Sequence, residues 1–489
     1  MLYTENKFTE KIFSNYGGTA RRRRAVQHTG YKEQCMFIGR DKELEILHQQ
    51  FNAAKRTAVL VYGKRRVGKS TLIKEAARDF AGVVINHLCI RSSYEGNLNL
   101  LCRSVCLALG LPPMNFASIF DLFDFLKSYS KPILIVLDEY QYLKDSLKEN
   151  EVDSYMQVIV DSLPENVKVV LCGSYISIMK ELLLESNPLF GRFTAIVHLE
   201  EFDYYDAAKF YPDLSVRDKI RFYAVFGGSP FVLTNLDPAQ DIRQNISSLL
   251  INQNSILRTH IENVMLSEIQ KAYDTRVFEI IGNSKKKYSD IAAHLGNRDN
   301  GLLDKQLKNL INMETLIKVF PINRSGDKKK QFYEIKDNLM RFYFAYIFGN
   351  DSLISKLGEE SFYDAHIASS LNTFVSYRFE GIVIQYFMRQ ARIGRLHGIE
   401  DFGSFWYDDK ETKTNGQFDC VLKEADGYDF YEVKFFEHPM TLDMCRKEEA
   451  QVRALTELYC RKIGFVCSAG FSFDTDEYDL ITGEELYNS

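Results

Sequence analysis

The segment Gly63-Lys64-Arg65-Arg66-Val67-Gly68-Lys69-Ser70 decides the fold of this 489-residue chain. It fits the pattern GxxxxGK[ST], in which a glycine-containing loop joins a strand to a helix. The flanking residues supply that context, because they predict an apolar strand at 58–62 and a helix at 71–80. The sequence therefore predicts a phosphate-binding loop at the carboxyl end of a buried strand, within an α/β fold.

Each part of this loop has an expected role in holding a nucleoside triphosphate. The glycines let backbone N–H groups face the phosphate oxygens, and the N-terminus of the following helix adds a favourable dipole. Lys69 is expected to reach the β- and γ-phosphates, and Ser70 to ligate Mg²⁺. The residues expected to surround the nucleotide are Gly63, Lys64, Arg65, Arg66, Val67, Gly68, Lys69, Ser70 and Thr71.

A second motif follows in Ile133-Leu134-Ile135-Val136-Leu137-Asp138-Glu139. The apolar run indicates a buried strand, and it delivers two carboxylates to the strand end. Asp138 is expected on the Mg²⁺ side of the phosphates. Glu139 is placed to orient or deprotonate the attacking water, and the alternative is a solvated residue at a strand end. ATP and Mg²⁺ are the cofactors that these two motifs predict.

Strands alternate with helices up to about residue 200, which predicts a parallel sheet covered on both faces. Further strands are expected at 83–88 and 167–172. Ser174 follows the second of these strands and is a candidate sensor of the γ-phosphate, with a plain turn serine as the alternative. Arg192 is a candidate arginine finger, acting within the chain or across a subunit contact, with a surface arginine as the alternative.

The composition is ordinary for a soluble globular protein, with 45% hydrophobic and 26% charged residues. A net charge of −5 means that any nucleic-acid contact must come from a local patch. Nine cysteines without CxxC pairing indicate reduced thiols. The sequence shows no signal pattern and no long apolar run, so we expect a cytoplasmic protein that makes no membrane contact.

Residues 275–335 have the pattern of a winged helix-turn-helix. Three short helices are expected at 276–281, 289–295 and 302–313, followed by strands at 316–321 and 331–335. The third helix would be the recognition helix, and the basic side chains expected to meet phosphates are Lys305, Lys308, Arg324, Lys328, Lys329 and Lys330, with Gln306 and Asn309 beside them. The alternative is a winged helix that packs against protein.

Six short strings occur in the order seen in the archaeal-type ATPase family. They are Phe37-Ile38-Gly39-Arg40, Gly63 to Ser70, Leu137 to Leu143, Gly173-Ser174, Leu189 to Arg192 and Gly227-Gly228-Ser229-Pro230. Over about residues 36–470 the chain thus resembles this branch of AAA+/STAND-like P-loop ATPases, which is also common in bacteria. The resemblance implies a helical lid in which Pro230 closes on the adenine, a winged helix, and a C-terminal nuclease-like domain.

The expected architecture is a P-loop NTPase parallel sheet with a helical lid, then a winged helix-turn-helix, then an α/β restriction-endonuclease-like domain. The expected boundaries are 1–34 for a basic N-terminal arm, 35–200 for the P-loop core, 201–272 for the lid, 273–348 for the winged helix and 360–475 for the nuclease-like domain.

The C-terminal segment carries its own candidate site. Asp419 lies on one predicted strand, and Glu432 and Lys434 lie on the next, on one face because side chains repeat every two residues. The string resembles the D…ExK signature of the PD-(D/E)xK nuclease superfamily. Asp419 and Glu432 would bind a metal ion that activates water, and Glu380 could add a third carboxylate. The alternative is a nuclease fold that no longer cuts.

Two functions remain open from the sequence. The first is an ATP-driven enzyme that acts on double-stranded DNA through the winged helix and the C-terminal domain. The second is a STAND-type nucleotide switch that binds a protein partner or a second copy of itself. The complete D…ExK string favours the first, and the acidic net charge favours the second.

Overall fold

The computed structural model describes residues 37–148, 150–262, 274–282, 284–296, 301–409, 413–454 and 459–488. The expected basic arm at 1–34 lies outside these ranges.

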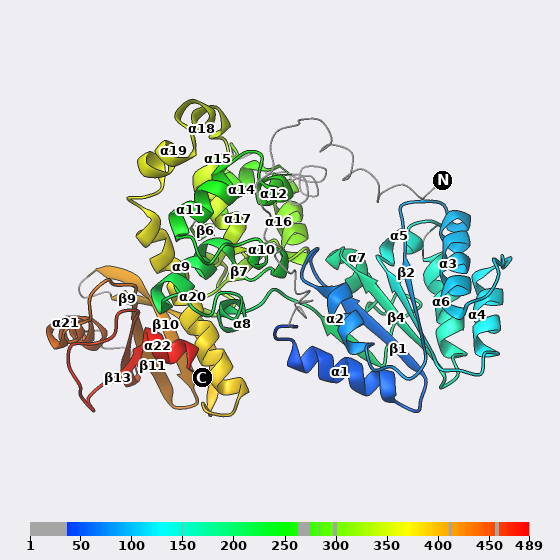
Figure 1. The fold of residues 1–489 in the computed structure, drawn as a ribbon. Coiled ribbons are helices and arrows are strands. Elements are labelled where there is room, and N and C mark those ends of the chain that lie inside the picture. Colours follow the sequence, from blue (N-terminus) through cyan, green and yellow to red (C-terminus); the bar gives the residue numbers. More distant parts are fainter. Residues whose placement is uncertain are drawn as a thin grey trace, which may run out of the picture. The chain divides into compact units, whose positions relative to one another are not determined.

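A five-stranded parallel sheet forms the first part of the chain (Figure 1). Its strand order is β2-β3-β4-β1-β5, and every neighbouring pair is parallel. The strands are β1 (Thr57–Tyr62), β2 (Val83–Leu88), β3 (Ile133–Asp138), β4 (Val167–Gly173) and β5 (Ala195–His198). The helices are α1 (Asp41–Asn52), α2 (Lys69–Ala76), α3 (Tyr94–Leu109), α4 (Ile119–Lys127), α5 (Gln141–Lys144), α6 (Glu151–Asp161) and α7 (Ile176–Glu181).

The central strands of this sheet are buried on both faces. Leu60 and Ile135 belong to an apolar cluster that includes helices α3, α4 and α6. Their neighbours Val59 and Leu134 point the other way and are also fully buried. A strand covered on both faces is apolar at nearly every position. This is why apolar runs predicted β1, β3 and β4 to within one residue, with Lys168 as the one break in β4, and the parallel sheet is confirmed. The edge strand β2 was also predicted within its bounds, although it carries Asn86 and His87.

Helix boundaries were predicted less well than strands. The helix after the phosphate-binding loop is α2, which begins at Lys69 and not at residue 71, because the last loop residues already form its first turn. The sequence predicted a helix from Asn97 to Leu109, but this helix, α3, begins at Tyr94, because the Ser93 hydroxyl caps it by accepting the N–H of Gly96 at 3.1 Å.

The chain continues after residue 200 with short helices, in the segment where the resemblance implied a helical lid. They are α8 (Tyr204–Ala208), α9 (Val216–Phe226), α10 (Pro230–Leu233), α11 (Ile242–Ile246), the π-helix η1 (Ser247–Ile251) and α12 (Ile256–His260). A second set of helices follows residue 335. They are α17 (Asn338–Phe342), the π-helix η5 (Tyr343–Ile347), α18 (Asp351–Leu357), α19 (Glu359–His366) and α20 (Leu371–Arg392).

Residues 274–335 contain the three helices and two longer strands that the sequence predicted. In chain order the elements are α14 (Arg276–Ile281), β6 (Lys286–Lys287), α15 (Tyr288–His294), α16 (Leu302–Asn312), β7 (Leu316–Val319), the 3₁₀ turns η3 (Ile322–Arg324) and η4 (Lys328–Lys330), and β8 (Phe332–Ile335). The strands form an antiparallel sheet in the order β6-β8-β7. We refer to these residues as the three-helix unit.

A second five-stranded sheet follows, in the order β13-β12-β11-β10-β9 (Figure 1). Its strands are β9 (Ile399–Asp409), β10 (Thr414–Glu424), β11 (Gly427–Lys434), β12 (Cys460–Cys467) and β13 (Asp479–Thr482), and its helices are α21 (Leu442–Arg453) and α22 (Gly483–Tyr487). β10 pairs antiparallel with both β9 and β11, whereas β12 pairs parallel with both β11 and β13. Helix α20 packs on one face through Phe379 and Ile382, and α21 packs on the other through Cys445 and Val452.

One apolar cluster runs through the described residues from Phe202 to Leu486. It joins α9, the three-helix unit, α20 and one face of the second sheet. The Tyr204 hydroxyl donates to the carbonyl of Leu486 at 2.8 Å, which links the two ends of this region. The segments predicted as lid, winged helix and nuclease-like domain therefore share a core, and we call residues 201–488 the C-terminal body.

The turn between β7 and β8 is docked on strand β9. The side-chain amide of Asn323 pairs with the backbone of Trp406 in both directions, donating to its carbonyl at 2.8 Å and accepting its N–H at 3.0 Å. The Lys330 ammonium lies 3.6 Å from the centroid of the Trp406 ring. The turn that the sequence predicted as a DNA-binding wing thus contacts the chain's own C-terminal sheet.

In the part of the chain that the structure describes, no helix is long and apolar enough to cross a membrane.

Candidate functional site

The phosphate-binding loop has the backbone conformation that its glycines predict. Gly68 has φ 91° and Arg66 has φ 66°, both in the left-handed region. A Cβ atom on Gly63 would lie 2.1 Å from the carbonyl oxygen of Leu199, so only glycine fits at the start of the loop. Lys69 donates to the carbonyls of Gly63 at 2.9 Å and Lys64 at 2.8 Å, and burial lowers its pKa.

The two motifs meet at the end of β1 and β3. The Ser70 hydroxyl donates to Asp138 Oδ2 at 2.6 Å. Mg²⁺ in P-loop NTPases is bound by a serine or threonine hydroxyl and an aspartate carboxylate, and these are the two groups that lie together here. The observed contact therefore fits a magnesium ion held by Ser70 and Asp138.

Glu139 lies directly beyond this pair. Its backbone has φ 53°, which a residue with a side chain rarely adopts. The Ser174 hydroxyl donates to Glu139 Oε2 at 2.6 Å, and the buried amide of Gln141 donates to the same oxygen. The structure thus brings Ser174 and Glu139 together at the carboxyl ends of β3 and β4. Gln141 was not among the predicted site residues.

The other loop residues contact segments on either side of the nucleotide site. Arg65 donates to the hydroxyls of Tyr142 at 3.0 Å and Tyr175 at 3.1 Å. The Arg66 guanidinium lies 3.7 Å from the centroid of the Phe231 ring. Val67 is buried and Thr71 is exposed.

Residues after the core also reach the loop. The Lys64 ammonium lies 3.9 Å from Glu201 Oε1 and 3.8 Å from Asp337 Oδ2. Pro230 Cγ lies 3.8 Å from the position that a Cβ on Gly68 would take. Pro230 therefore lies beside the loop, and its expected place over the adenine stays a prediction.

Arg192 is not brought to the phosphate-binding loop. Its Nε lies 3.1 Å from both carboxylate oxygens of Asp161, the last residue of α6. Arg56, just before β1, is 3.3 Å from the same carboxylate. These residues lie at the amino ends of the strands, whereas the loop follows the carboxyl end of β1. An arginine finger acting within the chain does not fit this placement, and the role across a subunit contact stays a prediction.

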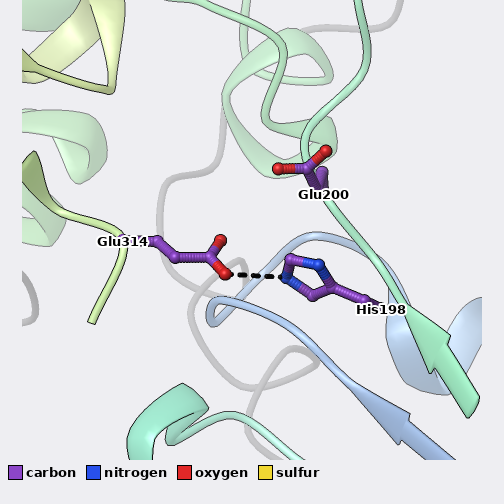
Figure 2. Close-up of side chains that lie close together, drawn as sticks. All are labelled: His198, Glu200 and Glu314. Atoms are coloured by element: carbon purple, nitrogen blue, oxygen red, sulfur yellow. Dashed lines mark ion pairs between the residues drawn. The ribbon is translucent and has the colours of Figure 1, made fainter. Parts of the chain in front are cut away.

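Figure 2 shows a cluster that the sequence did not suggest, formed by His198, Glu200 and Glu314. In the described ranges it is the one set of three potential ligand atoms within 4.8 Å of one another. His198 Nε2 lies 3.2 Å from Glu314 Oε1. Lysines also occupy the cluster, since Lys336 Nζ is 2.6 Å from Glu200 and 3.1 Å from Glu314, and Lys180 Nζ is 2.7 Å from Glu314. Ammonium groups thus neutralise the carboxylates of Glu200 and Glu314, and this arrangement favours an ion-pair cluster over a metal site.

The predicted carboxylates of the second sheet lie on adjoining strands. The pairing of β10 with β11 ends at Cys420 opposite Tyr431, and Asp419 and Glu432 are the next residues on the two strands, where β10 also carries a register shift against β9 between Phe418 and Val421. Burial first, and then the charge of Asp419, raises the pKa of Glu380 on α20 to about 8. Burial also raises the pKa of Glu432, with Lys434 opposing and Asp419 adding to the rise. The carboxylates of both strands and the helix therefore influence one another.

Lysines pair with these carboxylates too. Lys434 Nζ lies 2.5 Å from Glu432 Oε1 and 3.2 Å from Glu448 Oε1. Lys285 Nζ, from the three-helix unit, lies 3.9 Å from Asp419 Oδ1. The donor types suit Mg²⁺ or Mn²⁺, but the ion would have to displace these ammonium groups.

Only some of the polar side chains expected to meet DNA on the predicted recognition helix α16 are exposed to solvent. Lys305 and Lys308 are exposed. Gln306 is buried and donates to the carbonyl of Asp274 at 2.8 Å, because it shares the inner face of the helix with Leu303 and Leu310. Gln306 is therefore unavailable for a nucleic-acid contact, which corrects its expected place on the DNA-facing side.

Residues 37–236 match the model of an ATPase domain found predominantly in Archaea, and residues 343–451 match a family of archaeal and bacterial proteins of unknown function. An uncharacterized protein of Methanocaldococcus jannaschii is 27% identical over 384 residues, covering 77% of this chain and 83% of its own. An uncharacterized ATP-binding protein of the same organism is 48% identical over 40 residues, covering 8% of this chain and 68% of its own.

Two solved structures are also similar. A Walker-type ATPase of Pyrococcus abyssi has a TM-score of 0.46 at 18% identity, over 63% of this chain and 96% of its own. The ORC2 protein of Aeropyrum pernix has a TM-score of 0.42 at 13% identity, over 64% of this chain and 94% of its own.

The loop geometry, the Ser70–Asp138 contact and the match over residues 37–236 agree, and they lead to one conclusion. Residues 37–236 have the parallel sheet and the phosphate-binding loop that are typical of P-loop ATPases, and they match an ATPase domain found predominantly in Archaea.

Proposed function

We propose that this chain is a Mg²⁺-dependent ATPase whose nucleotide cycle controls an action of the C-terminal body on DNA. The observation that carries the proposal is the 2.6 Å contact of Ser70 with Asp138, with Glu139 next to it. A serine, an aspartate and a glutamate in this arrangement are the groups that P-loop hydrolysis requires.

The roles of the residues follow from their positions. Lys69, which now donates to loop carbonyls, would turn its ammonium to the β- and γ-phosphates. Ser70 and Asp138 would hold Mg²⁺, which neutralises phosphate charge. Glu139 would orient the attacking water and accept its proton. Ser174 would sense the γ-phosphate and hold Glu139 through the bond between their side chains.

Action on DNA is supported by the form of the three-helix unit, which we propose is a winged helix. The order helix, strand, helix, helix, strand, strand suits one, and α16 carries the exposed Lys305 and Lys308. Two lysines at this spacing lie on one side of a helix, where they can meet the phosphates of a duplex.

Cleavage is supported by the carboxylates of the second sheet. We assign Asp419 and Glu432 as ligands of a catalytic Mg²⁺ or Mn²⁺ and Lys434 as the lysine that stabilises charge at the scissile phosphate. The ion would supply an activated water. The chain's own residues would fix the position of the ion between β10 and β11, after Lys285 and Lys434 give up their present partners.

The test is nicking of supercoiled plasmid with Mg²⁺ or Mn²⁺, with and without ATP. The wild-type chain should cut, and Glu432→Ala should not. The matched control is Glu477→Ala, an exposed glutamate outside the carboxylate cluster, which should cut as the wild type does. If the wild type leaves the plasmid intact, or if Glu432→Ala cuts equally fast, the nuclease assignment is wrong.

A second candidate is a nucleotide switch that binds a protein partner. The docking of the β7–β8 turn on Trp406 favours it, because this turn is already used in a contact within the protein. In that case plasmid cutting is absent, and ATP hydrolysis is retained.

A further inference from the structure

We propose that Gln141 is a positioning residue for ATP hydrolysis, which holds the carboxylate of Glu139 in the orientation from which it acts on water. The inference rests on the proposed role of Glu139. Gln141 opens helix α5, two residues after Glu139, and lies outside both nucleotide-binding motifs.

Two donors meet one oxygen of the Glu139 carboxylate. The Gln141 amide donates to Oε2, and the Ser174 hydroxyl donates to the same atom at 2.6 Å. The amide nitrogen also lies 3.5 Å from the Ser174 oxygen, so the three side chains form a closed triangle. Among the residues that the structure describes, none donates to the second oxygen, Oε1. That oxygen keeps its lone pairs for a water molecule.

The Gln141 side chain is fixed by its surroundings. It is only 1% exposed, so its amide cannot turn toward solvent. A Cβ on Gly173 would lie 2.5 Å from the amide oxygen, which means that β4 needs a glycine there to admit this side chain. Because the side chain is buried and lies against Gly173, its NH₂ group can donate only toward Glu139 and Ser174.

The amide oxygen of Gln141 is buried without a hydrogen-bond partner among the described residues. A buried acceptor left unpaired is unfavourable, and an apolar side chain of the same shape would avoid the cost. Stability alone therefore does not explain an amide at this position. The amide nitrogen, which donates to Glu139, explains why an amide side chain stands here.

The backbone of Glu139 is held as well. Its left-handed conformation is followed by Tyr140, whose N–H donates to the carbonyl of Cys172 at 2.8 Å. With the backbone fixed, the orientation of the carboxylate depends on its two side-chain donors. Loss of one donor lets the carboxylate turn away from water, and a small displacement of a reacting group lowers the rate strongly.

The decisive variant is Gln141→Met, which keeps the side-chain length and removes the donor. We expect kcat for ATP to fall about tenfold, with KM and the ATP dissociation constant unchanged, because the phosphate-binding loop is untouched. The matched control is Gln49→Met on α1, where the exposed glutamine donates to Glu45. It should hydrolyse ATP as the wild type does. A cooperative thermal unfolding transition in both variants would verify that they are folded.

The same change in a Glu139→Gln background separates positioning from a structural role. A residue that acts through Glu139 has no carboxylate left to position there. Adding Gln141→Met to Glu139→Gln should therefore leave the residual single-turnover rate unchanged. A further tenfold loss in that background would overturn the inference.

The failure of the inference can be told from the failure of the proposed function. If Glu139→Gln hydrolyses ATP at the wild-type rate, the role of Glu139 is wrong and the role of Gln141 falls with it. If Glu139→Gln is inactive while Gln141→Met keeps the wild-type kcat, only the positioning role of Gln141 is overturned.

Discussion

The Lys330 ammonium lies over the Trp406 ring, 3.6 Å from its centroid, and so joins the three-helix unit to the second sheet. Trp406 is the only tryptophan of the chain, and Asn323 bonds its backbone in both directions. The basic turn that the sequence predicts as a wing is thereby given a structural role, which changes what its lysines are expected to do.

Replacing Lys330 should affect stability more than DNA binding. Lys330→Ala removes a cation–π contact, which contributes about 0.5–1 kcal/mol at an exposed site. Lys329→Ala is the control, because Lys329 lies in the same turn and is exposed. Urea unfolding followed by tryptophan fluorescence should show an earlier transition for Lys330→Ala alone. Equal transitions for both variants would contradict a role for the contact with Trp406.

Duplex binding should depend on α16. The double variant Lys305→Ala, Lys308→Ala should weaken binding and lower the slope of log K against log salt by up to about 2 units, at roughly 0.9 for each phosphate contact. Binding at several salt concentrations, measured by fluorescence anisotropy with a labelled duplex, gives that slope. A slope that stays the same would assign the exposed face of α16 to a protein contact.

Glu201 should make stability depend on pH. Burial, and then the charge of Asp337, raises the pKa of Glu201 to about 8. Between the usual carboxyl range and pH 8 the folded chain therefore keeps a proton that the unfolded chain has released, so stability falls as pH rises through this window.

Glu201→Gln cannot lose that proton. Its stability should fall less steeply between pH 5 and 8, by up to about 1.4 kcal/mol per pH unit. Denaturant unfolding at several pH values measures the slope, with the exposed Glu484→Gln as control. The assignment fails if Glu201→Gln follows the wild-type slope.

Strands and motifs were predictable because their signals are local. The run that became β3 is apolar up to Asp138, and the run that became β4 is interrupted only by Lys168, as burial on both faces favours. The loop from Gly63 to Ser70 carries glycine where a close approach or a left-handed backbone needs it. The D…ExK spacing likewise placed Asp419 and Glu432 on paired strands.

Contacts between distant residues were not predictable from local signals. The pairing of Asn323 with Trp406 joins residues 83 apart, and no periodicity in either segment indicates it. Arg192 could be placed only once the sheet showed that Asp161 lies at the opposite strand ends. Gln306 was different, because its spacing from Leu303 and Leu310 on a helix already indicated the inner face.

The most direct measurement is ATP turnover by Glu139→Gln, with nucleotide binding measured on the same sample. The variant removes the base and keeps the size of the side chain, so it should bind ATP with Mg²⁺ as tightly as the wild type. Its steady-state hydrolysis should fall by at least about a hundredfold, as expected for loss of a general base. Lys69→Ala, in contrast, should weaken binding itself. Hydrolysis by Glu139→Gln at the wild-type rate would contradict the assignment of the ATPase site.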